Sequence, residues 1–288
     1  MWQTIEKAIE QATNHSFSIV QRKIFTNGDS HLIYWISDSN KQYFVKIKNK
    51  DQLSQFDSEI YALEQLSASH YVSCPQVITS GITLDKSFLV LDYISFDPPV
   101  AKDWYQFGVQ IASMHQCINH GQFGWQYDNY IGDTLQPNHW QSNWRTFFAE
   151  QRIAWQLQLL YEKSIKLGDI EFITEVCHDA LLHHQVTPCL VHGDLWQGNL
   201  GFCEHTPFVF DPACYYGDRE VDLAMTELFG QLPENFYRGY HETFPISESY
   251  QQRKIIYNFY HILNHANLFG GLYIEQSKIT LSRILANH

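Results

Sequence analysis

Positive charge is scarce in this sequence. Its 288 residues include 19 Lys and Arg against 31 Asp and Glu, a formal net charge of −12 at pH 7, and only 17% of the residues are charged. Soluble proteins typically contain about 25% charged residues. Proteins that bind nucleic acids present clusters of Lys and Arg, and the sequence contains no such cluster. We therefore expect no nucleic-acid partner.

Long apolar runs and closely paired cysteines are also missing. No run approaches the roughly 18 residues that cross a bilayer, and residues 1–17 lack the basic start and apolar centre of a signal peptide. The six cysteines, at positions 74, 117, 177, 189, 203 and 214, form no C-x-x-C pair. This pattern is typical of free thiols in a reducing compartment. We expect a cytoplasmic protein with no membrane partner.

Aromatic residues are abundant where charges are few. The chain has 8 Trp, 17 Tyr and 19 Phe, 15% of its residues, within an ordinary apolar fraction of 44%. A chain of this length can form one large domain or two smaller ones with a full hydrophobic core. Because the aromatic side chains would suit a monomer's core or an interface, the oligomeric state, monomer or homodimer, stays open.

The secondary-structure pattern changes at residues 98–99, a Pro-Pro pair. Before it, helical patterns over 1–12 and 54–66 alternate with strand patterns, and after it helical patterns dominate. The expected strands are 17–25, 31–37, 42–48, 76–80 and 88–93, and the expected later helices are 103–119, 142–163, 170–185, 219–229 and 250–269. We predict a two-lobed α+β fold. A small antiparallel-sheet lobe takes residues 1–97, and a mostly helical lobe takes residues 98–288.

The most informative stretch, residues 190–211, reads LVHGDLWQGNLGFCEHTPFVFD. Asn199 follows Asp194 by five residues, and Asp211 stands twelve residues further on, at the end of an apolar strand pattern. The protein-kinase signature has the same spacing. Phosphoryl transfer needs a carboxylate to orient and deprotonate the attacking hydroxyl, which fits Asp194, and oxygen ligands for Mg²⁺, which fits Asn199 and Asp211.

Two upstream residues fit nucleotide binding in the same signature. Lys46 lies in an alternating strand pattern, YFVKIK, and Glu59 follows 59 − 46 = 13 residues later in the predicted helix. The lysine would neutralise phosphate charge, and the glutamate would fix the lysine rotamer. The strand that follows would lead into a hinge, where backbone groups of three residues would bind adenine: Asp92, Tyr93 and Ile94.

Three long motifs and several short ones extend over nearly the whole chain. The long ones read HGDLWQGN, FDPACYYGDREVDLAM and YNFYHILNHANLFGGLY, and the short ones read FVK, FDSE, DNYIG, WRTFF, QR and FYRGY. Together they resemble the fructosamine-3-kinase and ketosamine-3-kinase family, in its bacterial branch. That family belongs to the aminoglycoside and choline phosphotransferase group, so the resemblance implies a protein-kinase-like fold.

The resemblance also implies an activity. Members of this family are ATP-dependent kinases of ketosamines, the Amadori products of sugars with amines, and place the phosphate on the sugar 3-hydroxyl. The product is unstable and frees the amine, so the family is regarded as deglycating. By this resemblance the cofactors are ATP and Mg²⁺, the substrate is a small-molecule or protein-bound ketosamine, and Trp196 is a platform for the sugar. Four residues would support the catalytic loop without touching substrate: His192, Asp218, Arg219 and Asp222.

The expected phosphate loop departs from the family pattern. Where many relatives have paired glycines, residues 26–31 read TNGDSH, with Gly28 as the one glycine. Backbone N–H groups around Gly28 and Asp29 would still form an anion-binding nest. The effect of the single glycine on ATP affinity stays open. Some relatives also carry a redox-linked cysteine in this loop, and since none is present here, we expect no such switch.

Three other functions are weaker interpretations. A zinc hydrolase would use His261 and His265 at i, i+4, but the H-E-x-x-H motif needs a Glu that the sequence lacks. An aminoglycoside- or choline-type kinase would share the catalytic residues, but Trp196 and the block 218–222 favour a ketosamine. A catalytically inactive nucleotide-binding relative is disfavoured because every phosphotransfer residue is present. The preferred sugar and the nature of the amine, protein lysine or free molecule, stay open.

Overall fold

The computed structural model describes residues 1–25, 32–117 and 119–287. Gly28 and Asp29, which we expect in the phosphate loop, lie outside the described residues. The chain divides into two compact units. The N-terminal unit consists of Met1–Pro98 and Phe202–Phe210, and the helical unit consists of Pro99–Gly201 and Asp211–His288.

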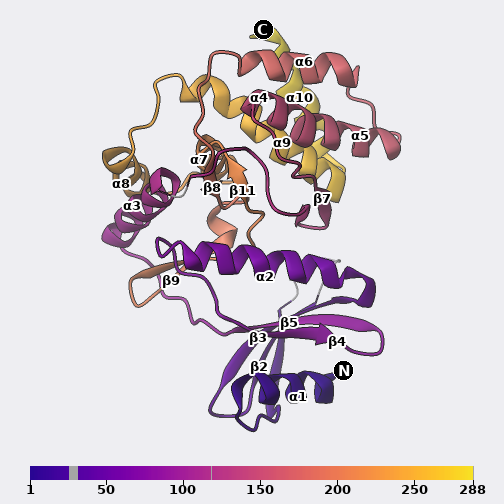
Figure 1. The fold of residues 1–288 in the computed structure, drawn as a ribbon, viewed down its shortest axis with the longest axis vertical. Helices are drawn as coiled ribbons and strands as arrows, with labels where there is room; N and C mark the ends of the chain where they lie inside the picture. Colours follow the sequence, from indigo (N-terminus) through magenta and orange to yellow (C-terminus); the bar gives the residue numbers. More distant parts are fainter. Residues whose placement is uncertain (26–31, 118, 288) are drawn as a thin grey trace. The chain divides into compact units, whose positions relative to one another are not determined.

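An antiparallel sheet of five strands forms the centre of the N-terminal unit, in the order β1-β2-β3-β5-β4 (Figure 1). Successive residues of a strand point to opposite faces of a sheet. Tyr43 and Val45 of β3 therefore lie on one face, and Phe44 and Lys46 lie on the other. The strands are β1 (Gln21–Phe25), β2 (Leu32–Ser37), β3 (Gln42–Asn49), β4 (Val77–Ile82) and β5 (Lys86–Asp92).

One helix covers each face of this sheet (Figure 1). Helix α1 (Trp2–Thr13) buries Ile5 and Ile9 against the face that carries Tyr43 and Val45. Helix α2 (Leu53–Ala68) buries apolar side chains against the other face. Each fully buried aliphatic or aromatic side chain contributes roughly 1.5–3 kcal/mol to folding, so both helices are fixed on the sheet by packing.

Strand β1 is shorter than the sequence pattern predicts. It begins at Gln21 and not at residue 17, because the preceding segment bonds to α1 side chains. The backbone N–H of Phe17 donates to Glu10 Oε1 at 3.1 Å, and that of Ile19 donates to Glu6 Oε1 at 2.7 Å. Phe17 and Ile19 therefore belong to the core under α1, whereas Val20 is exposed.

A hairpin from late in the sequence completes the N-terminal unit. Strands β9 (Leu200–Cys203) and β10 (Thr206–Val209) pair with each other. The backbone N–H of Asp97 donates to the carbonyl of Phe202 at 2.7 Å, and that of Val209 donates to the carbonyl of Ser73 at 2.9 Å. The chain thus passes through this unit between Asn199 and Asp211.

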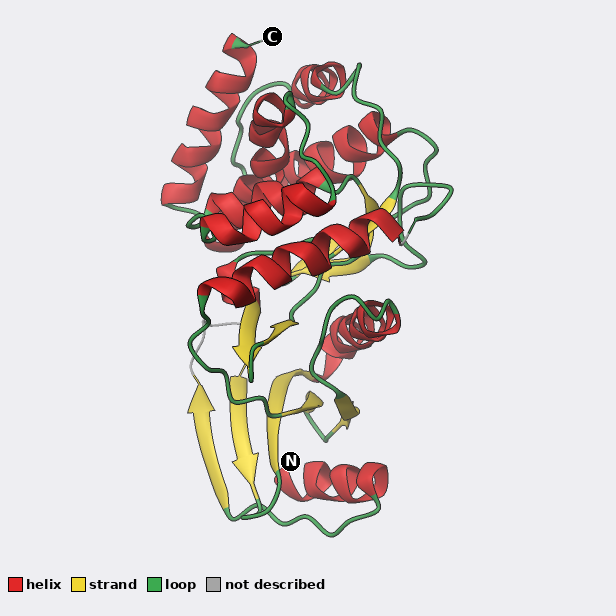
Figure 2. Ribbon diagram, turned by 90° about the vertical axis from the view of Figure 1, so that its left-hand side faces the viewer, coloured by secondary structure: helices red, strands yellow, loops and turns green. Residues whose placement is uncertain are grey.

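Helices make up most of the other unit, and its strands are confined to short pairs (Figure 2). The helices are α3 (Ala101–Cys117), α4 (Trp144–Phe148), α5 (Trp155–Glu162), α6 (Ile170–Ala180), α7 (Glu220–Leu228), α8 (Glu234–Thr243), α9 (Tyr250–Phe269) and α10 (Leu272–Ala286). The strand pairs are β6 (Asn129–Ile131) with β7 (Thr134–Gln136), and β8 (Cys189–Val191) with β11 (Tyr215–Gly217). In the part of the chain that the structure describes, no helix combines the length and apolarity that a bilayer span requires.

Helices α8 and α10 are absent from the sequence prediction. Helix α8 is short and polar, and its apolar residues Phe236 and Tyr240 form a narrow buried stripe. It packs closely on α3 because glycines stand at the contact. A Cβ on Gly108 would lie 2.0 Å from the carbonyl oxygen of Phe236, and one on Gly239 would lie 2.1 Å from that of Tyr105. Tertiary packing thus determines this helix more than its own periodicity does.

The helix predicted over residues 142–163 is interrupted by a π-helical turn. This turn, Ala149–Ala154, separates α4 from α5. It contains Arg152, whose side chain is fully buried and lies over the ring of Tyr215 at 4.2 Å. Since π-helical insertions shift the direction of the following side chains, the turn brings a buried cation into an aromatic core.

Candidate active site

The loop after β8 is held by one carboxylate of α7. The backbone N–H of His192 donates to Asp222 Oδ2 at 2.7 Å, and that of Gly193 donates to Asp222 Oδ1 at 2.8 Å. Two charge-assisted bonds thus fix the backbone immediately before Asp194. Glycine is required at 193, because its φ is +81° and a Cβ would lie 2.1 Å from the carbonyl oxygen of Ala213.

Asp222 is held in turn by His115 of α3. His115 Nε2 lies 3.1 Å from Asp222 Oδ2, and His115 Nδ1 lies 2.9 Å from the hydroxyl of Tyr240 in α8. Burial raises the pKa of Asp222, but the hydrogen bonds with His115 and His192 outweigh it, so this pKa lies below its usual value. The carboxylate is therefore ionised at neutral pH and connects the loop to three helices.

Asn199 bonds directly to Asp194. Its Nδ2 donates to the Asp194 carbonyl at 2.9 Å and to Asp194 Oδ2 at 2.8 Å. A short 3₁₀ turn, Gln197–Asn199, places the side chain there, and the Asn199 N–H donates to the carbonyl of Trp196 at 2.9 Å. Because the amide nitrogen bonds to Asp194, the Asn199 Oδ1 atom is the one suited to a cation.

Asp211 lies close enough to Asp194 to change its acidity. The pKa of Asp194 is raised to about 7, chiefly by burial; the hydrogen bond from Asn199 lowers it, and the charges of Asp211 and Asp222 add to the rise. Asp211 also has a φ of +54°, a left-handed conformation that costs energy for a non-glycine residue and is common at functional sites. The structure therefore brings Asp194, Asn199 and Asp211 together.

A buried amide network supports the segment just after Asp211. Asn129 Nδ2 donates to the carbonyl of Cys214 at 2.8 Å, and Gln136 Nε2 donates to the carbonyl of Ala213 at 3.2 Å. Gln136 also bonds to Asn129 at 2.8 Å. In the sequence, Asn129 stands out only as part of the DNYIG motif, since nothing in the spacing indicates that the β6–β7 pair contacts this segment.

Asp218 and Arg219, just before α7, bond to other parts of the helical unit. Asp218 Oδ2 accepts a hydrogen bond from the Tyr257 hydroxyl at 2.5 Å and lies 2.6 Å from His184 Nε2. Arg219 donates to two carbonyl oxygens after α8, at 3.0 and 2.6 Å. These two residues fix the start of α7, the helix that carries the carboxylate bound to the loop.

One cluster of the described residues has the spacing of a metal site. The ligand atoms of His184, Asp218 and Glu220 lie within 4.8 Å of one another. Arg253 binds Glu220 through two hydrogen bonds of 2.7 Å, so a buried guanidinium neutralises this carboxylate. The cluster is therefore a closed ion-pair network. It does not include His261 and His265, the two residues that a zinc hydrolase would use.

Trp196 lies at one end of a partly exposed aromatic cluster. Its ring is 5.8 Å from that of Phe229, and the Phe229 ring is 4.5 Å from that of His265. Tyr273 lies 5.0 Å from His265, and Phe269, with 67% of its surface exposed, lies 5.5 Å from it. The sequence indicates Trp196 alone, because Phe229 directly follows α7 and the remaining rings come from α9 and α10.

In the N-terminal unit, Lys46 and Glu59 form an ion pair. Lys46 Nζ lies 2.6 Å from Glu59 Oε1, and the two side chains are 7% and 15% exposed. Strand β3 places Lys46 on the face covered by α2, where Glu59 is located. The pair is thus buried enough for the carboxylate to hold the ammonium group in one position.

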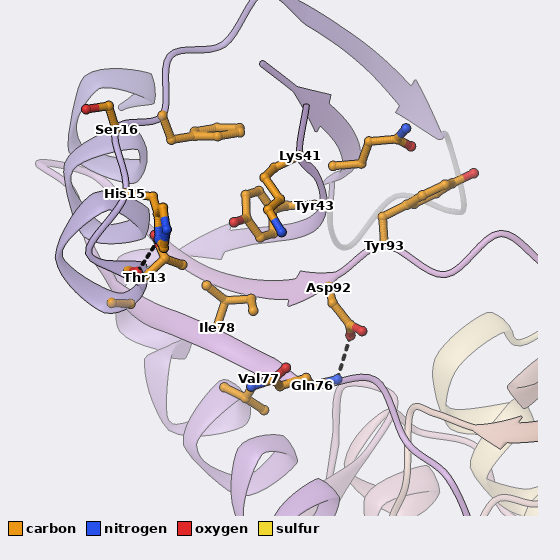
Figure 3. A pocket seen from close by; sticks show the side chains of 13 residues that line it. Thr13, His15, Ser16, Lys41, Tyr43, Gln76, Val77, Ile78, Asp92 and Tyr93 are labelled. Carbon is orange, nitrogen blue, oxygen red and sulfur yellow. Dashed lines mark hydrogen bonds between the residues drawn. The ribbon is translucent and has the colours of Figure 1, made fainter. Parts of the chain in front are cut away.

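The side chains of Asp92 and Tyr93 line a cavity of about 530 Å³ in this unit (Figure 3). The end of α1 and residues 41–43 and 76–78 form its other walls. Asp92 Oδ1 accepts a hydrogen bond from the N–H of Gln76 at 2.5 Å, and burial raises the Asp92 pKa. The Asp92 side chain points to the α1 face, whereas Lys46 lies on the α2 face.

The fold and these residues define a class of protein. The aminoglycoside phosphotransferase APH(2'')-Ib has the same fold, with a TM-score of 0.63 at 15% identity over 96% of this chain and 98% of that chain. The predicted fold class is confirmed. The chain therefore has a protein-kinase-like fold.

Comparisons at the level of sequence give the family. Residues 1–287 match the fructosamine kinase family. A probable ketoamine kinase of Vibrio vulnificus is 45% identical over 287 residues, which cover 99% of this chain and 100% of the relative. A crystal structure from Haemophilus somnus, named “putative fructosamine-3-kinase”, has a TM-score of 0.95 at 33% identity over 99% of this chain and 98% of that chain. The chain belongs to the fructosamine kinase family and is an ATP-dependent kinase.

Proposed function

We propose that this enzyme phosphorylates the sugar 3-hydroxyl of ketosamines and so starts their deglycation. The observation that carries the proposal is the group of Asp194, Asn199 and Asp211, present in a chain that matches the fructosamine kinase family from end to end. The relatives named as ketoamine kinases support the same substrate class. A phosphate on C3 is adjacent to the carbonyl carbon, so the product loses it readily and frees the amine.

Asp194 is the proposed general base. It accepts the proton of the sugar hydroxyl while the hydroxyl oxygen attacks the γ-phosphate of ATP. A pKa of about 7 suits this role, because general acid–base catalysis is most efficient when the pKa is close to the working pH. Asn199 holds Asp194 through two hydrogen bonds, and Asp222 fixes the backbone before it.

The residues present fit a Mg²⁺ ion. Asp211 supplies a carboxylate and Asn199 supplies Oδ1, and hard cations prefer such oxygen ligands. The charge of Asp211 raises the pKa of Asp194, and a cation at Asp211 would offset this repulsion. Asn199 and Asp211 would therefore hold the ion, which neutralises phosphate charge when bound.

The N-terminal unit is the proposed nucleotide-binding part, and the helical unit supplies the catalytic and substrate residues. Lys46, held by Glu59, would contact the phosphates. Backbone groups of residues 92–94 would bind adenine, and Gly28 and Asp29 would complete the phosphate loop. The cytoplasm, where ATP is available and thiols stay reduced, is the proposed compartment.

The aromatic cluster around Trp196 is the proposed substrate wall. Sugar carbons can pack on the indole ring, and the protonated amine of a ketosamine would be attracted to aromatic faces. Phe229, His265 and Tyr273 extend this surface beyond Trp196. The partial exposure of the cluster would leave room for a small amine or a lysine side chain.

A substrate panel tests this proposal. ATP consumption would be measured with Mg²⁺ over fructosamines, ribulosamines, aminoglycosides and choline. We expect turnover on ketosamines, loss of turnover with EDTA, and a fall of several orders of magnitude in Asp194→Asn with ATP binding retained. Turnover confined to another alcohol would contradict the substrate, and full activity of Asp194→Asn would remove Asp194 from the mechanism.

A further inference from the structure

His261 of α9 presents a buried nitrogen to the proposed catalytic carboxylate. The residue is 2% exposed, and its Nδ1 atom has no hydrogen-bond partner among the described residues. Asp194 Oδ1 lies 4.0 Å from this nitrogen. From the sequence, His261 is a candidate only as a zinc ligand, because helical spacing cannot show that α9 faces the loop of Asp194.

The two polar residues of α9 that lie nearest, Tyr260 and Asn264, do have buried partners. The Tyr260 hydroxyl donates to Gln136 Oε1 at 2.5 Å, and Asn264 Oδ1 accepts from Gln156 Nε2 at 3.3 Å. A buried nitrogen without a partner lowers stability, whereas an apolar side chain at the same place would not. The imidazole of His261 is therefore a costly choice for packing alone.

The distance between the two atoms suits one intervening oxygen. A separation of 4.0 Å is too long for a direct hydrogen bond. An oxygen about 2.8 Å from both atoms would see them at an angle of about 90°, which is acceptable for a hydroxyl that donates one bond and accepts another.

The charge state of His261 agrees with this geometry. Burial, together with the nearby His265, lowers the pKa of His261 to about 3, so the imidazole is neutral at pH 7. A neutral imidazole with its proton on Nδ1 can donate to a hydroxyl oxygen. The same hydroxyl can donate its own proton to Asp194 Oδ1.

We propose that His261 is a substrate-binding residue that holds the acceptor hydroxyl between its Nδ1 and Asp194 Oδ1. This assignment rests on the proposed function and adds a residue to its site. The hydroxyl proton passes to Asp194 as the new O–P bond forms, the bond from the γ-phosphorus to ADP breaks, and ADP leaves. His261 keeps its own proton throughout and fixes the direction of the attacking oxygen.

Two substitutions with opposite expectations test the assignment. The side-chain amide of His261→Asn lies where Nδ1 lies, whereas the amide of His261→Gln reaches the place of Nε2. We expect kcat/KM for a ketosamine to fall about 10- to 100-fold in His261→Gln and to stay within about threefold in His261→Asn. The KM for ATP should stay within twofold in both variants. A residue with a merely structural role would change the kinetic constants for both substrates, so an effect confined to the ketosamine separates the two roles.

Asn258→Ala is a matched control on the same helix. Asn258 also has a buried oxygen without a partner among the described residues, but no contact with Asp194 is observed. Its kinetic constants should stay within twofold of the wild type. If the wild type turns over no ketosamine, the proposed function fails. If the wild type turns over a ketosamine and His261→Gln has the same kcat/KM, the assignment of His261 fails. The assignment also fails if kcat/KM falls as far in His261→Asn as in His261→Gln.

A measurement on the unaltered protein does not depend on variants that fold. In wild-type enzyme labelled with ¹⁵N-histidine, a ketosamine added without ATP should shift the Nδ1–H signal of His261 and slow its exchange with water. The signal would be assigned by its loss in any His261 variant. No change in that signal at a ketosamine concentration that saturates binding would overturn the assignment.

Discussion

Replacement of Asp222 by Asn tests how the catalytic loop is held. The Asp222 carboxylate accepts backbone hydrogen bonds from His192 and Gly193 and also bonds to His115. An amide keeps one acceptor and replaces the other with a donor. The bonds from His192 and His115 share Asp222 Oδ2, so an amide that turns its oxygen to them loses the bond from Gly193. The two remaining bonds then go to a neutral acceptor and not to a charged one.

The magnitude follows from these three bonds. A hydrogen bond to a buried charge contributes about 1.5–3 kcal/mol and one to a neutral group about 0.5–1.5 kcal/mol. With one bond lost and two weakened, we expect Asp222→Asn to lose about 3–5 kcal/mol of unfolding free energy. Released from Asp222, the loop would let Asp194 move, and a shift of about 1 Å can reduce the rate about 100-fold. We therefore expect kcat on a ketosamine to fall by about two orders of magnitude.

Urea unfolding and steady-state kinetics measure the two effects. Glu227→Gln is the matched control, because Glu227 lies on the same helix and bonds to Tyr250 and Lys254 away from the loop. The unfolding free energy of Glu227→Gln should fall by about 1 kcal/mol, and its kcat should stay unchanged. A large loss of stability in Asp222→Asn with unchanged kcat would refute the reasoning, because the carboxylate would then not position the catalytic loop.

Three further predictions concern other parts of the account. Gly193→Ala should reduce kcat at least 100-fold, because its Cβ would clash with a backbone oxygen. The same clash should lower the unfolding free energy measured with urea by on the order of 2–3 kcal/mol. Wild-type kinetics would contradict this prediction. Glu59→Gln should raise the KM for ATP about tenfold and leave the KM for a ketosamine within twofold, because Lys46 loses its buried partner; a change in the ketosamine KM alone would count against it. His261 should make stability depend on pH. Its folded pKa of about 3 lies below the unfolded value near 6.5, so the unfolded chain binds a proton first as pH falls, and stability is lost from pH 6.5 towards 3. Between pH 7 and 5, the free energy of unfolding of His261→Asn should fall by about 2 kcal/mol less than that of the wild type. Equal losses would show that His261 is not buried in its neutral form.

Local patterns were enough to predict the main architecture. The alternating strands before residue 98 and the helical patterns after it predict a sheet unit followed by a helical unit, and the helix over 250–269 has the predicted bounds. The spacing of Asp194, Asn199 and Asp211 predicts that these residues lie together, because a short loop and a hairpin separate them. Their chemical roles stay predictions that the variants above would test.

Long-range contacts were not predictable in the same way. Asn129 and Gln136 support the segment after Asp211, but 77 or more residues separate the bonded groups. Helix α8 is short and mostly polar, and it packs on α3 through glycines of both helices. In each case the signal lies in the packing of distant elements, which a single sequence does not display.

The central claim is that this kinase transfers the ATP γ-phosphate to the 3-hydroxyl of a ketosamine at Asp194. The most direct test is to incubate the enzyme with ATP, Mg²⁺ and a fructosamine, and to record ¹H–³¹P correlation spectra while free amine is measured. The account predicts coupling of phosphorus to the proton on C3, followed by amine release, with neither signal in Asp194→Asn. Coupling to a proton on another carbon, or product formation by Asp194→Asn at the wild-type rate, would contradict it.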